Sequence, residues 1–219
     1  NSILPNLPIN CMKEIPNQEV MICTRGGGVF IANTPEKRIR NTNITKDDCF
    51  NNVQCMLVND KRLEMIYGTA SNGILQTLYT FIYTKNETIV DTNTNTRTAI
   101  VTLCAFQNKE KDFIWFGTAG YGIAKYLEKT NSVEYLESTS RMRVVSICEY
   151  DDDHLYFVDD SRGLMVLNKI SGEIVQKKTF NQNIFNSLGN NFTDVRLHNA
   201  DNGNILLFNI GGKHYMIKQ

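Results

Sequence analysis

The 219-residue sequence lacks the features that mark several large classes of protein. Lys+Arg and Asp+Glu both total 23, so the basic excess that phosphate contacts require is missing and we expect no nucleic-acid partner. No run of about 20 apolar residues occurs, so no segment is expected to insert into a membrane. No 3.6-residue hydrophobic period is sustained over the roughly 11 residues that indicate a helix. The sequence therefore predicts an all-β protein.

The sequence also lacks the common signatures of catalysis and of cofactor binding. No CxxC or Cys/His spacing indicates zinc, and no Ser or Cys nucleophile stands in an elbow motif. Gly26, Gly27 and Gly28 resemble a phosphate loop only in composition, and we expect them to supply positive φ in a tight hairpin. We predict no catalytic residue, no metal and no cofactor. A hydrolase or a lyase is a functional class that stays open.

What the sequence does contain is a repeated unit, seen most clearly in FIWFGTAGYGIAKY (Phe113–Tyr126). It reads as an apolar strand, a small-residue turn and a second strand. Aligned on Gly122, the pattern returns at Gly28, Gly73, Gly163 and Gly212. The intervals, 28 to 73, 73 to 122, 122 to 163 and 163 to 212, have the length of a four-stranded propeller blade. We predict a β-propeller of about five four-stranded blades.

The blades are expected at residues 9–41, 53–91, 99–136, 144–180 and 192–219 of a single domain that spans residues 1–219. In the second blade we place the fourth strand at Tyr79–Tyr83. The fifth blade lacks an outer strand, which leaves two interpretations. Residues 1–8 supply that strand and close a five-bladed ring, the interpretation we favour slightly, or the chain is a fragment of a larger ring. Because it begins at Asn1 without an initiator Met, we expect a piece of a longer protein.

Four of the six cysteines stand near one column of the repeat. Cys11, Cys55, Cys104 and Cys148 precede their aligned glycines by 17, 18, 18 and 15 residues. Cysteines that repeat in register are expected to be small buried thiols on each blade's first strand rather than disulfide partners. Reduced thiols favour a reducing compartment.

Three stretches resemble the two-component regulator propeller repeats. They are IWFGTAGYGIAKY (Ile114–Tyr126), EYL (Glu134–Leu136) and RVVSICEYDDDHLYFVDDSRGLMVLN (Arg143–Asn168). The resemblance implies the periplasmic, extracytoplasmic sensor region of a membrane-bound hybrid histidine kinase that reads glycan fragments. In the fourth blade Val158-Asp159 replaces the Gly-Thr pair of the family pattern. A cytoplasmic WD-like propeller that acts as a protein-interaction scaffold gives a comparable pattern and is the alternative.

Candidate binding residues come from the tips between second and third strands, which emerge on one face of a propeller. Arg25, Asn72, Tyr121 and Arg162 stand there and are predicted to form a polar ring at one mouth of the channel. Arg and Tyr are typical of partner hot spots and of sugar-stacking sites. The expected partners are a carbohydrate or small-molecule signal, or a protein, besides neighbouring domains of a longer chain. The alternative is that these are ordinary exposed turn residues.

Two further groups of residues have a structural interpretation. The acidic stretch Asp151–His154 looks like a metal cluster but has no calcium-loop spacing, so we predict a solvated hairpin turn. Large aromatic residues on the second strands are expected to wedge between neighbouring blades. These are Tyr67, Trp115, Phe116, Phe157 and Phe208.

Overall fold

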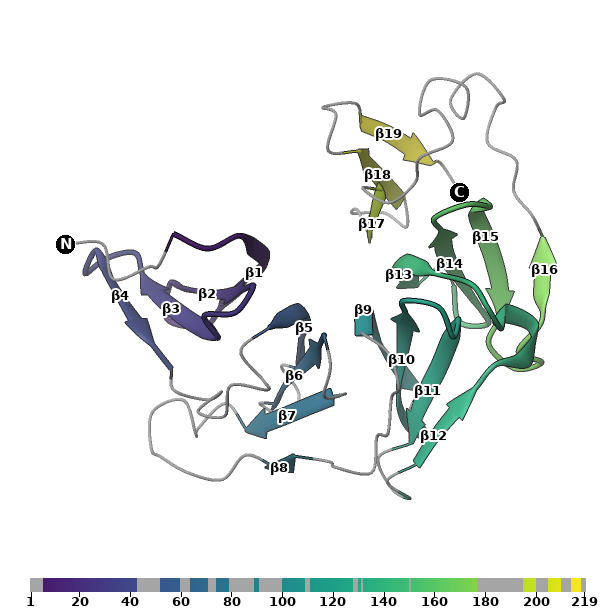
Figure 1. Cartoon of the computed structure of the whole chain (residues 1–219), viewed down its shortest axis with the longest axis horizontal. Coiled ribbons are helices and arrows are strands. Elements are labelled where there is room, and N and C mark those ends of the chain that lie inside the picture. The colour runs from purple at the N-terminus through teal and green to yellow at the C-terminus, as the bar shows by residue number, and fades with distance from the viewer. Residues whose placement is uncertain are drawn as a thin grey trace. The chain divides into compact units, whose positions relative to one another are not determined.

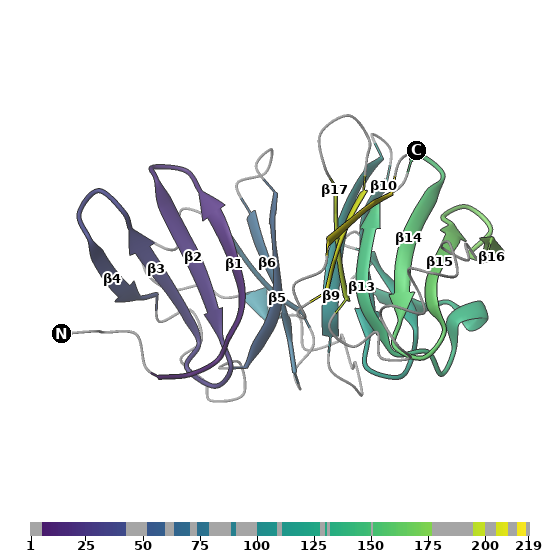
Figure 2. The same ribbon diagram turned by 90° about the horizontal axis from the view of Figure 1, so that it is seen from above.

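The structure, a computed structural model, describes residues 6–42, 52–59, 64–70, 74–78, 89–90, 100–108, 111–127, 130, 132–149, 151–176, 195–199, 205–209 and 214–217. The chain divides into two compact units, Asn1–Val101 and Thr102–Gln219. Both are built from antiparallel sheets in which the strands follow one another in chain order. Figures 1 and 2 show these sheets from two directions.

The first unit contains two four-stranded sheets. The first sheet consists of β1 (Ile9–Ile15), β2 (Glu19–Thr24), β3 (Val29–Asn33) and β4 (Arg38–Asn41). In Figure 2 these four strands lie side by side in that order. The second sheet consists of β5 (Val53–Asn59), β6 (Glu64–Thr69), β7 (Ile74–Leu78) and β8 (Ile89–Val90).

The second unit contains two four-stranded sheets and one sheet with three described strands. The first is β9 (Ile100–Asn108), β10 (Lys111–Thr118), β11 (Ile123–Leu127) and β12 (Ser132–Tyr135). The next is β13 (Val144–Glu149), β14 (His154–Asp159), β15 (Gly163–Asn168) and β16 (Ile174–Gln176). The last is β17 (Val195–Asn199), β18 (Ile205–Asn209) and β19 (His214–Ile217).

The all-β prediction is confirmed for the described residues, in which a 3₁₀ turn at Glu137–Thr139 interrupts an otherwise β architecture. The edge strand that pairs with β7 is β8, whereas the predicted strand Tyr79–Tyr83 lies outside the described residues. Residues 6–8 form no strand and residues 1–5 lie outside the described part, so ring closure stays a prediction. Within the described residues, no helix has the length and apolar character needed to cross a membrane.

The central strands are apolar along their length because each packs on both faces. β14 has the sequence HLYFVD, and its last five residues are all buried. Strands buried on both faces read as continuous apolar runs, whereas strands with one wet face alternate. In β1, an edge strand, most residues are exposed or half-buried.

A hydrophobic core fills the space between neighbouring sheets in each unit. In the first unit Met21 and Ile31 pack with Tyr67. In the second unit Trp115 packs with Phe157. The prediction that aromatic residues on second strands wedge between sheets is therefore confirmed for Tyr67, Trp115 and Phe157, each of which is 0% exposed. Burying such a side chain stabilises the fold by about 1.5–3 kcal/mol. The side chain of Phe208 lies outside the described residues.

The cysteine column lies on the first strand of each sheet, as expected. Cys11, Cys55, Cys104 and Cys148 belong to β1, β5, β9 and β13. Cys11, Cys23, Cys55 and Cys148 are reduced thiols. The prediction of buried thiols holds for Cys148 but is wrong for Cys11 and Cys55, which are half-buried. Cys11 packs only partly against the hydrophobic core of the first unit.

Candidate functional site

The turn between β10 and β11, which carries the predicted site residue Tyr121, is closed by the side chain of Thr118. The Thr118 hydroxyl donates to the Gly122 carbonyl at 2.9 Å and accepts the main-chain N–H of Tyr121 at 3.0 Å. Gly122 has a φ of 74°, a left-handed conformation that favours glycine. The turn thus fixes the Tyr121 main chain while the Tyr121 side chain stays 50% exposed.

The same turn recurs in two other sheets. Between β2 and β3, the Thr24 hydroxyl donates to the Gly28 carbonyl at 2.9 Å and accepts the N–H of Gly27 at 3.1 Å. Between β14 and β15, the Asp159 carboxylate takes the place of the hydroxyl and accepts the N–H of Arg162 at 2.7 Å. In each case the closing side chain stands four residues before the aligned glycine. A Thr or Asp at that spacing is therefore a second sequence feature, besides the glycine, that indicates this turn.

The connector from β12 to β13 packs directly against the β10–β11 turn. The N–H of Gly122 donates to the Met142 carbonyl at 2.9 Å, and the N–H of Ile123 donates to the Thr139 hydroxyl at 2.9 Å. A Cβ atom on Gly122 would overlap the main-chain carbonyl of Thr139. The connector and the turn therefore form one rigid corner of the second unit.

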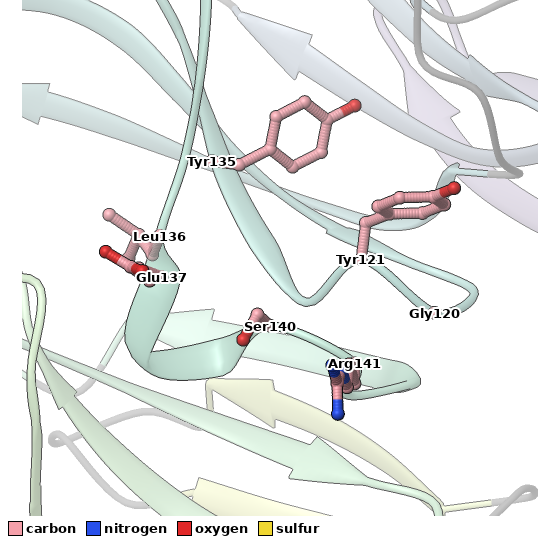
Figure 3. A pocket seen from close by; sticks show the side chains of 7 residues that line it. All are labelled: Gly120, Tyr121, Tyr135, Leu136, Glu137, Ser140 and Arg141. Atoms are coloured by element: carbon pink, nitrogen blue, oxygen red, sulfur yellow. The ribbon is translucent and has the colours of Figure 1, made fainter.

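A depression of about 770 Å³ opens at this corner (Figure 3). It is lined by Gly120, Tyr121, Tyr135, Leu136, Glu137, Ser140 and Arg141. These residues come from the β10–β11 turn, from the end of β12 and from the connector that leads to β13. The volume falls in the range of about 300–1,000 Å³ that is common for small-molecule sites.

Two tyrosine rings form one wall of the depression. The centroids of Tyr121 and Tyr135 lie 6.2 Å apart, and the rings are tilted by 57°. Both side chains are partly exposed, at 50% and 42%. Behind them the buried ring of Phe116 contacts Tyr135 edge-on, with centroids 6.5 Å apart at 78°. The pair is thus an aromatic surface that is supported from the core and open to solvent.

The opposite wall is polar and comes from the connector. Glu137, Ser140 and Arg141 are all exposed there. Arg141 has a φ of 65°, which is uncommon for a residue other than glycine. Such conformations cluster at functional sites, where the surrounding structure holds them. A carboxylate, a hydroxyl and a guanidinium opposite two aromatic rings can hydrogen-bond the rim of a ligand whose faces lie on the rings.

The four predicted site residues have different places in the structure. Tyr121 lines the depression. Arg25 is exposed in the first unit, where its N–H donates to the Pro8 carbonyl at 2.9 Å. Arg162 is exposed at the β14–β15 turn and does not line the depression. Asn72 lies outside the described residues, so the predicted polar ring stays a prediction.

Sequence reasoning did not select the connector residues. Glu137 and Arg141 lie between the predicted blades 99–136 and 144–180, and Tyr135 stands near the end of the first of these, where the alignment on glycines assigns no binding residue. The polar and aromatic composition of YLESTSRMR (Tyr135–Arg143) was the available signal.

The acidic stretch Asp151–His154 forms the hairpin turn between β13 and β14, as predicted. One Asp151 carboxylate oxygen accepts the N–H of Asp153 at 2.8 Å and of His154 at 2.7 Å, and Asp151 also pairs with the His154 ring at 2.9 Å. Partial burial by itself raises the pKa of Asp151. The hydrogen bonds and the charge of His154 lower that pKa by a larger amount, so it lies below its ordinary value. Among the described residues, no three His, Cys, Asp or Glu side chains are grouped to hold a metal ion.

Comparisons with known proteins agree on the fold. No protein-family model matches the chain, and no curated protein matches it in sequence. Among solved structures, the extracellular domain of BT4673 from B. thetaiotaomicron, named as a one-component system, matches with a TM-score of 0.69 at 13% identity over 94% of this chain and 27% of that one. A second structure of it, named as a hybrid two-component system, matches with a TM-score of 0.68 at 16% identity, over 92% of this chain and 26% of that one.

The WD40 β-propeller domain of Doa1 is similar to the same degree, with a TM-score of 0.67 at 12% identity, over 95% of this chain and 62% of that one. At these identities the likeness shows the fold, which is propeller-like. The chain spans about a quarter of the length of the BT4673 extracellular domain.

Proposed function

We propose that this chain is a ligand-sensing propeller module of a two-component signalling receptor, located outside the cytoplasm. The depression beside Tyr121 and Tyr135 is its recognition site. The observation that carries the proposal is this aromatic surface, because a ring pair that only filled the core would be buried, whereas these rings are 50% and 42% exposed. The likeness to the BT4673 extracellular domain supports the sensing role.

The signal we propose is a glycan fragment or a similar small molecule. The apolar faces of a sugar ring stack on tyrosine, and its hydroxyls bond to side chains such as Glu137, Ser140 and Arg141. Binding at the corner between two sheets gives a route to signalling, because the β12–β13 connector joins those sheets. We expect no catalytic turnover, cofactor or metal in this region.

A titration of the purified chain with an array of neutral, amino and uronic-acid disaccharides tests this site. Binding is measured by NMR saturation transfer and by calorimetry on the sugars that respond. Tyr121→Ala and Arg141→Ala should weaken binding by roughly tenfold or more, the cost of losing a hot-spot residue. The matched controls Val175→Ala and Arg38→Ala, at exposed positions that do not line the depression, should bind normally. Normal binding by both site variants would refute the assignment.

The predicted polar ring is tested in the same titration. If the tips of several sheets share one ligand, Arg25→Ala, Asn72→Ala and Arg162→Ala will weaken binding together with Tyr121→Ala. If the ligand contacts the depression alone, only Tyr121→Ala will do so. The proposed polar ring requires the blades to surround one axis, as they do in a propeller. We propose a propeller of about five blades that is either closed by residues 1–8 or continued in a larger ring.

The alternative is a cytoplasmic WD-like scaffold, which the reduced thiols and the likeness to the Doa1 WD40 domain favour. Fractionation of the source cells, with the protein detected by antibody, separates the two. Recovery in the periplasmic or membrane fraction supports the sensor, and recovery in the cytosol supports the scaffold.

A further inference from the structure

Cys11 and Cys23 face each other across the first two strands. They are register partners in the antiparallel pair β1–β2, next to the irregularity between Ile9 and Cys11. Residues directly opposite in such a pair have Cα atoms about 4.5–5.5 Å apart. A disulfide requires Cα atoms roughly 4.4–6.8 Å apart, so the backbone already has the needed spacing.

We propose that Cys11 and Cys23 are a redox-active pair that closes into a cross-strand disulfide when the protein meets a disulfide oxidant. The inference is independent of the proposed recognition site, because the pair lies in the first unit and the depression in the second.

In the register of their own sheets, the other described thiols stand opposite residues that are not cysteine. Cys55 stands opposite Gly68 in the β5–β6 pair, and Cys148 stands opposite Tyr156 in the β13–β14 pair. Cys148 is therefore a built-in control for the pair, whereas Cys55 lies near enough to Cys23 to contribute electrostatically to the raised pKa of the Cys23 thiol. Near Cys23, the neighbouring sheet contributes Met56, whose sulfur lies 4.0 Å from the Cys23 sulfur.

The two thiols differ in how accessible they are to a reagent. Cys11 is half-buried and can be reached by a reagent, whereas Cys23 is 0% exposed. A hydrogen bond with Cys11, together with burial, raises the pKa of the Cys23 thiol well above its ordinary value. The contact between the two side chains agrees with the register, and because Cys11 is accessible whereas Cys23 is buried, we expect Cys11 to react first.

The chemistry is thiol–disulfide exchange in two steps. The Cys11 thiolate attacks one sulfur of oxidised glutathione, which forms a mixed disulfide and releases one glutathione as thiolate. Cys23 then loses its proton to solvent, and its thiolate attacks the Cys11 sulfur and expels the second glutathione. Two protein thiols are oxidised, and one glutathione disulfide is reduced to two thiols.

The bond would join an exposed edge strand to the buried interior of its sheet. β1 keeps most of its side chains exposed or half-buried, whereas β2 is almost fully buried. In an oxidising compartment the disulfide would therefore hold the edge strand on its neighbour, and in a reducing one both thiols would persist.

The test is redox titration of the native chain in mixtures of oxidised and reduced glutathione, followed by alkylation and peptide mapping by mass spectrometry. Circular dichroism checks that the fold is retained. We expect one cross-linked peptide pair, joining Cys11 to Cys23, whose fraction rises with the oxidised share. Cys148→Ser should leave it unchanged, and Cys11→Ser should abolish it.

Wild-type mapping decides the matter even if a variant fails to fold. A glutathione adduct on Cys11 without loss of the Cys23 thiol would overturn the proposal. So would a cross-link between other cysteines, or full retention of both thiols at the most oxidising ratio.

Discussion

Replacing Gly122 with alanine tests the idea that one glycine joins the turn and the connector into a single corner. Gly122 has a φ of 74°, and an added Cβ would overlap the Thr139 carbonyl. Gly120 lies in the same turn with a φ of 142°, yet a Cβ there meets nothing within 4 Å. Gly120→Ala is therefore a matched control, because it imposes backbone strain without the overlap.

The expected cost has two parts. Forcing alanine into a left-handed conformation costs about 1–2 kcal/mol, a cost shared by both variants. In Gly122→Ala the connector must also move, which breaks the hydrogen bonds from Gly122 to Met142 and from Ile123 to Thr139. Each costs about 1–3 kcal/mol when a buried group is left unsatisfied. Together these costs come to about 3–8 kcal/mol for Gly122→Ala, at or beyond the upper end for single substitutions.

Urea unfolding of both variants, followed by circular dichroism and by NMR signals of the second unit, measures the difference. Gly122→Ala should unfold at a clearly lower urea concentration than Gly120→Ala, and its Tyr121 and Tyr135 signals should shift because the depression is displaced. Equal destabilisation of the two variants would refute the argument that the Thr139 segment requires a glycine at this position.

Three further predictions concern the turns. Asp159→Ala should destabilise by about 2–4 kcal/mol in urea unfolding, because the buried carboxylate closes the β14–β15 turn and also accepts the N–H of Arg143 at 3.0 Å. Thr118→Val should cost about 1–2 kcal/mol, since it removes the closing hydroxyl, whereas Thr118→Ser should be nearly neutral. For Asp151 the folded pKa is lowered, so its contribution to stability is present above the ordinary pKa of 3.8 and is lost as the pH falls through the lower folded value. Asp151→Asn should remove that part of the acid dependence, and a stability–pH profile identical to wild type would contradict it.

The strands of the repeat could be predicted because each residue there follows local rules. The sequence runs VFIAN and ILLFN are rich in β-forming residues, and they form the strands Val29–Asn33 and Ile205–Asn209. Cys11, Cys55, Cys104 and Cys148 were placed on the right strands by period alone. The pairing of Cys11 with Cys23 was not predicted. It depends on the register between β1 and β2, which contains an irregularity between Ile9 and Cys11 that the alignment of the repeats does not show.

The candidate site could be predicted only in part, for a different reason. Tyr121 follows from the repeat, whereas Tyr135 is placed beside it by the pairing of β12 with β11, and Arg141 by the connector. The position of Arg141 depends on a 3₁₀ turn of three residues and on its own positive φ, neither of which has a sequence signature of its own. Contacts of this kind are set by tertiary packing, here by Thr139 against Gly122.

The hydrogen bonding of the repeated turn also explains why the residue at its tip can vary between sheets and can therefore be used to contact a ligand. The residue before the aligned glycine is Gly27, Tyr121 or Arg162 in the three turns that the structure describes in full. In each, the main-chain N–H of that residue is held by the closing side chain, at 3.1, 3.0 and 2.7 Å. Because the turn is stabilised through the main chain, the tip side chain adds little to the stability of the fold. Selection for a ligand can therefore change it freely, which is how binding loops on a fixed scaffold diverge.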